Sequence, residues 1–423
     1  MPAGFFVRTI SLSSAVLVSI NIIIGAGLFI NPAPLTQIAH GWGFAAYLLS
    51  GLVLLPLILC IATLATHKPT AGGLYVYAHD FVSPMAGFIS GWSYFLGKST
   101  SAAILAYTFC SFIKSLFVSL QAWPTTVLTI LVLFFLSLCN IAGLKIGGKV
   151  QWLFIGFKAI PIALVLFTGI FLAQGGWPEA FPVTALEHLP QALPIAIFAL
   201  CGFEVICSIA HLIENPKKNV RRAILISFTT VALASALFQL GMWQMLGPEL
   251  SSIPSPIMAY ASKLFGEYPW VVRLFNAFVY ASVLGGSFGM LTSNCWNLQT
   301  IATHKHLPGW RYLSLVSKKQ VPWVSLLVET VLASVIISLQ SSQIPLQNMA
   351  VFGMTVGYFM STIAAYKASL PRVLVVFSFM SCAYILWLCA LRIINSGASV
   401  YFLLILATGI LLASWKKFTQ RTR

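Results

Sequence analysis

Long runs of apolar residues follow one another along almost the whole chain, and only short polar segments separate them. A helix needs ~20 residues to cross the apolar core of a bilayer, and the runs are about that long or longer. The pattern therefore predicts an all-α, polytopic membrane protein with about 12 transmembrane helices. The expected spans are 10–37, 43–66, 83–117, 123–143, 148–174, 190–213, 222–247, 270–303, 322–340, 345–366, 371–394 and 398–415.

The first and the sixth apolar run are interrupted by small residues. Gly25-Ala26-Gly27 breaks the first run and Cys201-Gly202 breaks the sixth, so spans one to five and six to ten each begin with a broken helix. Five spans per half place the two halves in opposite orientations, which is the inverted-repeat design of many secondary transporters. No linker divides the chain, so we expect one transmembrane domain over 1–423. It would contain a 5+5 inverted repeat (about 10–174 and 190–366) and two additional C-terminal helices (about 371–415).

Interrupted helices at mid-membrane free backbone groups that can bind a zwitterion. N–H groups at the first break would attract a carboxylate, and carbonyl groups at the second break would accept hydrogen bonds from an ammonium group. The alternative for each motif alone is close helix packing through small residues, but two corresponding breaks favour a substrate site. Phe198 is either a lid over this site or a core aromatic residue. The backbone positions expected to bind substrate are Ile24, Gly25, Ala26, Gly27, Ala199, Leu200, Cys201 and Gly202.

The charge distribution changes the meaning of the formal net charge of +16. Only 8% of the residues are charged and 59% are hydrophobic, and the Lys and Arg residues gather in alternate loops while most acids lie in the others. This is the positive-inside pattern of membrane proteins. It predicts a multi-pass protein of the inner or plasma membrane with both termini in the cytoplasm. The basic residues therefore face anionic lipid and not a nucleic acid.

Ionisable residues inside spans are the candidates for coupling chemistry. Lys98, Lys158 and Glu204 lie well inside their spans, whereas Glu329 lies in the cytoplasmic third of span nine, where it can reach the interface. Burial disfavours the charged form of such groups, which suits them to proton exchange. The alternative is a structural role, in which each group bonds to a backbone carbonyl or to another helix.

The sequence offers no constellation for catalysis or for a cofactor. Asp80 is the only aspartate, and the histidines lack the spacing of a metal site. The eight cysteines are not paired in spacing and suit small apolar packing. No Walker-type nucleotide motif is present. We therefore expect a protein that is not an enzyme and that uses neither a metal ion nor a cofactor.

Several short motifs, in order along nearly the whole chain, resemble those of the amino acid–polyamine–organocation (APC) permeases, closest to the bacterial arginine/agmatine antiporter branch. The resemblance implies the five-plus-five fold, alternating access and a substrate head group held by the broken helices. The segments that carry it are Gly25-Ala26-Gly27-Leu28-Phe29, Pro69 to Tyr77 with Gly72-Gly73, Asn140-Ile141-Ala142-Gly143-Leu144-Lys145 with Val150-Gln151, Gly202-Phe203-Glu204 and Asn215-Pro216-Lys217-Lys218-Asn219-Val220.

The resemblance also implies roles for single residues. Tyr94 is similar to the gate tyrosine of the family, and Phe198 takes the place of its gate tryptophan. Glu204 matches a glutamate linked to the proton response. Lys158 is similar to a lysine whose ammonium stands where sodium-coupled relatives bind a sodium ion, which implies a sodium-independent transporter.

Two departures from the arginine-exchanger pattern concern the substrate. Lys98 and Ser287 replace a small uncharged residue and a tryptophan that line the side-chain pocket in that branch. A buried ammonium at Lys98 would repel a guanidinium, since like unit charges ~4 Å apart interact by ~4 kcal/mol at an effective dielectric constant of about 20. We therefore expect a neutral or acidic amino acid, with a cationic amino acid–amine exchanger as the alternative.

Together these features predict a secondary active amino acid permease or antiporter that works by exchange or with protons. Its partners would be an amino acid or amine substrate, protons and the lipid bilayer. The sequence leaves the oligomeric state open, a homodimer included. The rival interpretations are a channel, which would show a continuous polar stripe, a non-transporting sensor on the same fold, and a membrane-embedded enzyme.

Overall fold

The computed structural model describes residues 10–25, 27–69, 73–142, 148–171, 181–208, 210, 213–319, 321–395 and 402–411. Over these residues the chain is helical and forms no strand, apart from a single parallel bridge between Ile10 and Ile213. The helices are α1 (Leu12–Ile23), α2 (Gly27–Ile30), α3 (Pro32–Ala39), η1 (His40–Trp42), α4 (Gly43–His67), α5 (Gly73–Phe81), α6 (Pro84–Leu116), α7 (Val118–Gln121), α8 (Thr125–Ile141), α9 (Gly148–Phe171), η2 (Val183–His188), α10 (Leu189–Leu200), α11 (Val205–Ser208), α12 (Pro216–Leu246), η4 (Gly247–Ser252), α13 (Pro256–Phe265), α14 (Pro269–Thr303), α15 (Trp310–Leu313), α16 (Trp323–Leu339), α17 (Gln343–Lys367) and α18 (Arg372–Asn395). A further apolar helix covers Phe402–Leu411.

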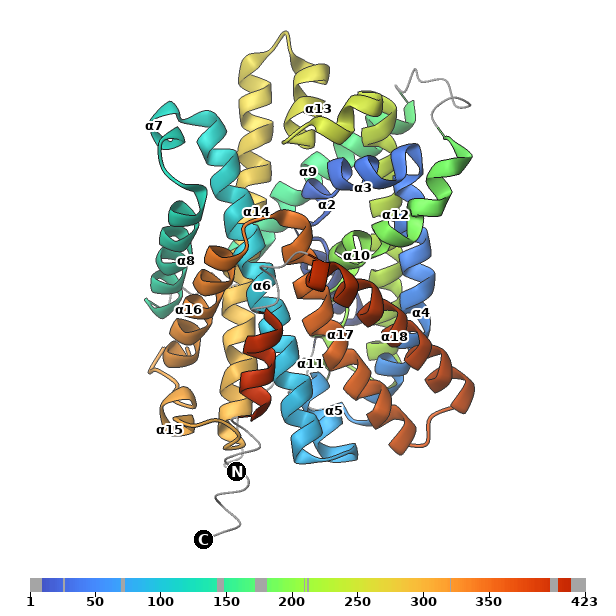
Figure 1. Ribbon diagram of the computed structural model, residues 1–423, viewed down its shortest axis with the longest axis vertical. Coiled ribbons are helices and arrows are strands. Elements are labelled where there is room, and N and C mark those ends of the chain that lie inside the picture. Colours follow the sequence, from blue (N-terminus) through green and yellow to red (C-terminus); the bar gives the residue numbers. More distant parts are fainter. Residues whose placement is uncertain are drawn as a thin grey trace.

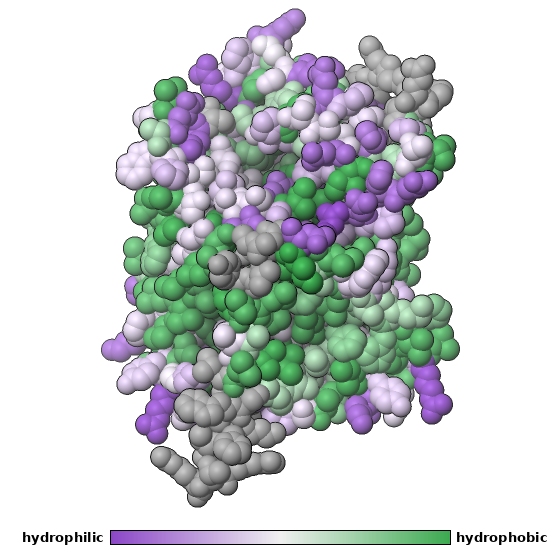
Figure 2. Space-filling model, in the orientation of Figure 1, coloured by the Kyte–Doolittle hydropathy of each residue, from purple (hydrophilic) through white to green (hydrophobic). Residues whose placement is uncertain are grey.

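The helices form the bundle of a multi-pass membrane protein. Seven helical segments of the described chain are long and apolar enough to cross a membrane, and four shorter apolar helices accompany them. Hydrophobic residues form a broad belt across the face shown in Figure 2, and hydrophilic residues gather at the top and along the lower rim. The prediction of an all-α polytopic protein is therefore confirmed.

Helix α6 runs through the middle of the bundle and organises the helices around it (Figure 1). It begins at Pro84, where the Ser83 side chain caps it by accepting a hydrogen bond from the N–H of Ala86 (3.1 Å). Helices α14 and α17 both pack along α6, and α4 packs against α10, α12 and α18. The contact between α6 and α17 is close and depends on a glycine. A Cβ added to Gly353 would lie only 2.7 Å from the carbonyl oxygen of Ser93.

Helix α5 is tied to the end of α4 by the only aspartate of the chain. Asp80 forms an ion pair with Lys68 and accepts a hydrogen bond from His79 (2.6 Å). Partial burial works to raise the pKa of Asp80, but its bonds to Lys68 and His79 outweigh this effect and hold the pKa below its ordinary value. The charged carboxylate thus links the last turns of α5 to Lys68 at the end of α4.

The two helices with predicted breaks are interrupted where the glycines lie. Helix α1 ends at Ile23 and α2 begins at Gly27, and α10 ends at Leu200 before α11 begins at Val205. The expected extent of span one, to residue 37, is wrong in detail. Pro32, which has no N–H to give, begins the separate helix α3.

Candidate functional site

The two interruptions lie against each other in the middle of the bundle. A Cβ on Gly27 would lie 2.8 Å from the Cβ of Ala199, so only glycine allows α2 to approach the end of α10 this closely. Gly202 has a φ of +124°, in the region that favours glycine, and its own Cβ would lie 3.2 Å from the Cα of Ile23. Each break therefore supplies a glycine that packs on the backbone of the other broken helix.

A cavity of about 130 Å³ lies beside the first break. Engineered protein cavities of about 150 Å³ admit a ring the size of benzene, so this space fits a small organic molecule. An adjoining hollow shares some of the same wall and reaches the second break. The walls shared by the two hollows are Ile22, Gly25, Lys98, Leu105 and Met290.

Most of the residues predicted to bind substrate line these two hollows, and some do not. The substrate-site residues that line them are Gly25, Gly27, Lys98, Phe198, Ala199 and Cys201. Lys158, predicted to take part in proton coupling, also lines the cavity. The described residues that do not are Ile24, Leu200, Gly202 and Ser287, and Ala26 lies outside the described residues.

Ser287 requires a correction, because it was expected to face the substrate side chain. Its side chain is fully buried and turns away from the cavity, and its Oγ donates a hydrogen bond to the carbonyl oxygen of Ala102 on α6 (3.0 Å). The glycines of the same helix α14 form the wall in its place: Gly285, Gly286 and Gly289.

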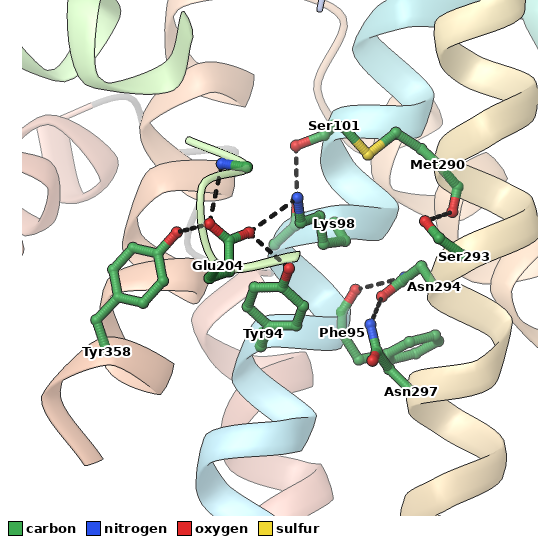
Figure 3. Close-up of polar contacts among 12 residues, drawn as sticks. Tyr94, Phe95, Lys98, Ser101, Glu204, Met290, Ser293, Asn294, Asn297 and Tyr358 are labelled. Atoms are coloured by element: carbon green, nitrogen blue, oxygen red, sulfur yellow. Dashed lines mark hydrogen bonds and ion pairs between the residues drawn. The ribbon is translucent and has the colours of Figure 1, made fainter. Parts of the chain in front are cut away.

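The carboxylate of Glu204 collects four donors at the second break (Figure 3). The Lys98 ammonium lies 3.1 Å from Oε1, and the Tyr94 hydroxyl donates to the same oxygen at 2.6 Å. Oε2 accepts from the Tyr358 hydroxyl and from the N–H of Gly202, both at 2.9 Å. The break, α6 and α17 are thereby joined through one side chain that is only 1% exposed.

This ion pair corrects two expectations. Lys98 does line the cavity, but its charge is compensated by Glu204, so it does not act on a substrate as an isolated buried cation. Glu204 in turn is not a free carboxylate waiting for a proton, because a cation and three hydrogen-bond donors stabilise its charged form.

The Lys98–Glu204 pair stands between two hollows. Lys98 lines the cavity at the first break, whereas Glu204 and Tyr94 line a smaller hollow toward α5. A path from the cavity to the α5 end of the molecule would therefore pass this pair. The other walls of the smaller hollow are Leu74, Tyr75, Gly91, Asn297 and Thr300.

Lys158 of α9 bonds to the end of α1. Its ammonium donates to the backbone oxygen of Asn21 (3.1 Å) and to the Asn21 side-chain oxygen (3.3 Å). The last carbonyls of a helix have no partner within the helix and favour a cation. Lys158 therefore satisfies the carbonyl end that the first break creates.

Some residues of the site were not predicted from the sequence. Tyr358 lies in an ordinary stretch of span ten, and no local pattern marks it as a partner of Glu204. Asn21 could have been found from the sequence, because it is a polar residue inside an apolar run. Glu329 corrects another expectation, because it is fully buried on α16 and does not reach the interface.

Comparisons with known proteins identify the family of the chain. Residues 10–413 match the family model described as "Amino acid permease". The Asc-type amino acid transporter 1 of Mus musculus is 27% identical over 361 residues, covering 82% of this chain and 67% of the relative. The large neutral amino acids transporter small subunit 2 of Mus musculus is 25% identical with the same coverage. The b(0,+)-type amino acid transporter 1 of Mus musculus is 25% identical over 295 residues, covering 67% of this chain and 60% of the relative.

Proposed function

The chain belongs to the amino acid permease family, and from that premise we propose that it is a secondary active amino-acid transporter that works by alternating access. The observation that carries the proposal is the pair of adjoining hollows, whose walls include both broken helices through Gly25 and Gly27 on one side and Ala199 and Cys201 on the other. Transporters of this architecture bind substrate between discontinuous helices near the bilayer midplane.

The head group of the substrate is proposed to lie between the two interruptions. The backbone N–H group of Gly27, at the start of α2, would hold its carboxylate, and the carbonyl groups at the end of α10 would accept from its ammonium group. The last four carbonyls of a helix have no partner within it, and Phe198 and Ala199 belong to this turn and line the hollow. Phe198 and Tyr94 would form the gates on the two sides of the bound substrate.

The proposal includes sodium independence. The Lys158 ammonium occupies oxygen ligands at the end of α1 that a sodium ion would otherwise use. A fixed cation here performs the neutralising role of a bound ion. Lys158 and Glu204 are proposed to take part in coupling transport to protons. The Lys98–Glu204 pair would open and close the passage toward α5.

We propose a neutral or acidic amino acid as the substrate. The cavity is lined by two ammonium groups, and among the described residues only Lys98 has an anionic partner, Glu204. A cationic side chain would therefore add a positive charge beside the Lys158 ammonium, which bonds to neutral oxygens of Asn21. One relative is named for large neutral amino acids, which agrees with a neutral substrate. Exchange of arginine for agmatine, the mode suggested by the sequence motifs, is the alternative.

The test is counterflow with the purified protein in liposomes. We expect an unlabelled neutral or acidic amino acid inside to drive uptake of its radiolabelled form, equally well in sodium and in choline buffer. Gly27→Val is the matched inactive control, because its side chain would fill the contact with Ala199. Counterflow carried best by arginine or agmatine would replace the substrate proposal, and a requirement for sodium would refute the role given to Lys158.

The same experiment separates a transporter from a channel or a sensor. A channel would pass the labelled substrate without stimulation by substrate on the other side, and a sensor would bind it without any flux. Binding that is measured by thermal shift, together with absent counterflow for every amino acid and amine, would contradict the proposed function.

A further inference from the structure

A second buried carboxyl group lies away from the proposed substrate site. Glu329 projects from α16 and is fully buried. Its Oε1 accepts one hydrogen bond, from the side-chain amide of Asn294 on α14 (3.0 Å), and its Oε2 has no hydrogen-bond partner. No Lys, Arg or His of the described chain forms an ion pair with it.

The two buried glutamates Glu204 and Glu329 thus have opposite environments. Glu204 receives a cation and three further donors, which stabilise a carboxylate. Glu329 receives one neutral amide, and an isolated ionised carboxylate is very costly in an apolar interior. The environment of Glu329 therefore favours the neutral carboxylic acid.

We propose that Glu329 is a proton-binding site of this protein and that its protonation is coupled to the movement of α6. The proposal rests on the proposed transport function. Uptake adds one proton from water to a carboxylate oxygen and changes the side-chain charge from −1 to 0, and release returns the proton to water. An intramembrane carboxyl group of this kind is a functional candidate by default, and the surrounding contacts give it a route and an effect.

A chain of amides connects Glu329 to the smaller hollow, and water entering from that hollow would carry the proton. The Asn297 amide donates to the side-chain oxygen of Asn294 (2.9 Å), and the Asn294 amide donates to Glu329 (3.0 Å). Asn297 also lines the hollow that contains Tyr94 and Glu204. Figure 3 shows Asn294 and Asn297 on α14, directly beside the α6 segment that carries Tyr94 and Lys98. Glu329 is therefore two side chains away from the proposed passage.

The effect on α6 comes through Asn294. Its amide also donates to the carbonyl oxygen of Phe95 (3.0 Å) and to the hydroxyl of Ser99 (3.2 Å). These two residues flank the α6 segment of the Lys98 gate. A neutral Glu329 lets α16, α14 and α6 remain clamped through Asn294, whereas an ionised one would draw in water. By reciprocity, the clamped conformation binds the proton more tightly than an open one.

Among the described residues, the charged side chains on the helices that pack against α16 are placed elsewhere and form no ion pair with Glu329. Helices α6, α8, α14 and α15 pack against α16. Helix α8 has no Asp, Glu, Lys, Arg or His, and the buried Cys295 of α14 is an uncharged titratable neighbour of Glu329. The cations of the other elements have their own positions: Lys98 pairs with Glu204, Lys114 donates to the carbonyl oxygen of Trp123, Arg273 lies in the first turns of α14, and Arg311 lies over the Trp310 ring.

The test compares Glu329→Gln with wild type in counterflow, with equal pH on both sides, from about pH 5 to about pH 8. Because one proton controls the rate, we expect wild-type counterflow to change by up to about tenfold per pH unit beyond the midpoint. Glu329→Gln mimics the neutral acid and should flatten this profile to within about twofold. Ser334→Ala, which removes a buried hydroxyl of the same helix, should keep the wild-type profile.

The outcomes separate the two proposals. Counterflow in wild type with an unchanged pH profile in Glu329→Gln, or a wild-type profile that is flat, overturns the proton site and leaves the transport function standing. No counterflow in wild type at any pH contradicts the transport function instead. If Glu329→Gln fails to fold, Glu329→Asp retains a carboxyl group in a changed position. A shifted midpoint then supports the site, and an unshifted midpoint overturns it.

Discussion

Four donors converge on Glu204, and this concentration of hydrogen bonds defines the site at the scale of single residues. The pair that it forms with Lys98 is almost completely buried on both sides. A buried pair is held by mutual compensation: each charge is tolerated because the other is present. The pair therefore combines a high cost of separation with a position on the proposed passage, which suits a gate.

The first prediction concerns this compensation. Lys98→Met or Glu204→Gln alone should each destabilise the protein by about 3–5 kcal/mol, because an uncompensated buried charge or donor remains. The double variant should recover much of this loss. Thermal stability of the purified protein in detergent provides the measurement. Lys114→Met on the same helix, whose ammonium bonds to a carbonyl oxygen, should have little effect. Strictly additive losses in the double variant would mean that the two side chains do not act as a pair.

At the scale of elements, the interruptions in α1 and α10 depend on each other. Gly27 and Gly202 each admit the backbone of the other broken helix, and Lys158 satisfies the carbonyl end of α1 near the same point. Neither break is stable as a local feature alone, since a helix interrupted in a membrane needs other groups to satisfy its freed backbone. The site is therefore a property of the contact between two helices.

Gly202→Ala tests this interdependence. An alanine at φ +124° costs about 1–3 kcal/mol in strain, and its Cβ would meet Ile23. We expect a lower melting temperature and weaker substrate binding in a thermal-shift titration. Gly156→Ala on α9 is the matched control, because a Cβ there meets nothing within 4 Å and alanine favours a helix over glycine by about 1 kcal/mol. A Gly202→Ala protein with wild-type stability and affinity would show that the break tolerates a side chain.

At the scale of the whole molecule, local sequence patterns predicted the helices and their interruptions, but not which distant side chains lie together. Apolar runs and glycine positions predicted the helical bundle and both interruptions, because these depend on neighbours in the chain. The partner of Lys98 could not be predicted, because Glu204 lies in the interruption between α10 and α11 and only the packing brings the two together. The same reason explains why Ser287 was expected in the cavity and Glu329 at the interface. In both cases the rotation or depth of a helix decides what its side chain contacts.

The charge distribution predicts how the molecule sits in its membrane. Helix α14 has 35 residues, about 50 Å at ~1.5 Å per residue, and crosses an apolar core of about 30 Å, so its ends lie on opposite sides. The segment after α14 carries four cations and no acid, namely Lys305, Arg311, Lys318 and Lys319, whereas the segment before it contains Glu249 and Glu267. The positive-inside rule then predicts that the α15 end of Figure 1 lies in the cytoplasm.

Cysteine labelling tests this orientation, since seven of the eight native cysteines are buried. Ser252→Cys on η4 and Thr303→Cys at the end of α14 place exposed thiols at the two ends. In intact cells a membrane-impermeant maleimide should label the Ser252→Cys protein, and the Thr303→Cys protein should react only after permeabilisation. The wild type provides the background. The reverse pattern would invert the molecule and would place the Lys98–Glu204 passage toward the outside, so that Glu329 would exchange protons with the external solution.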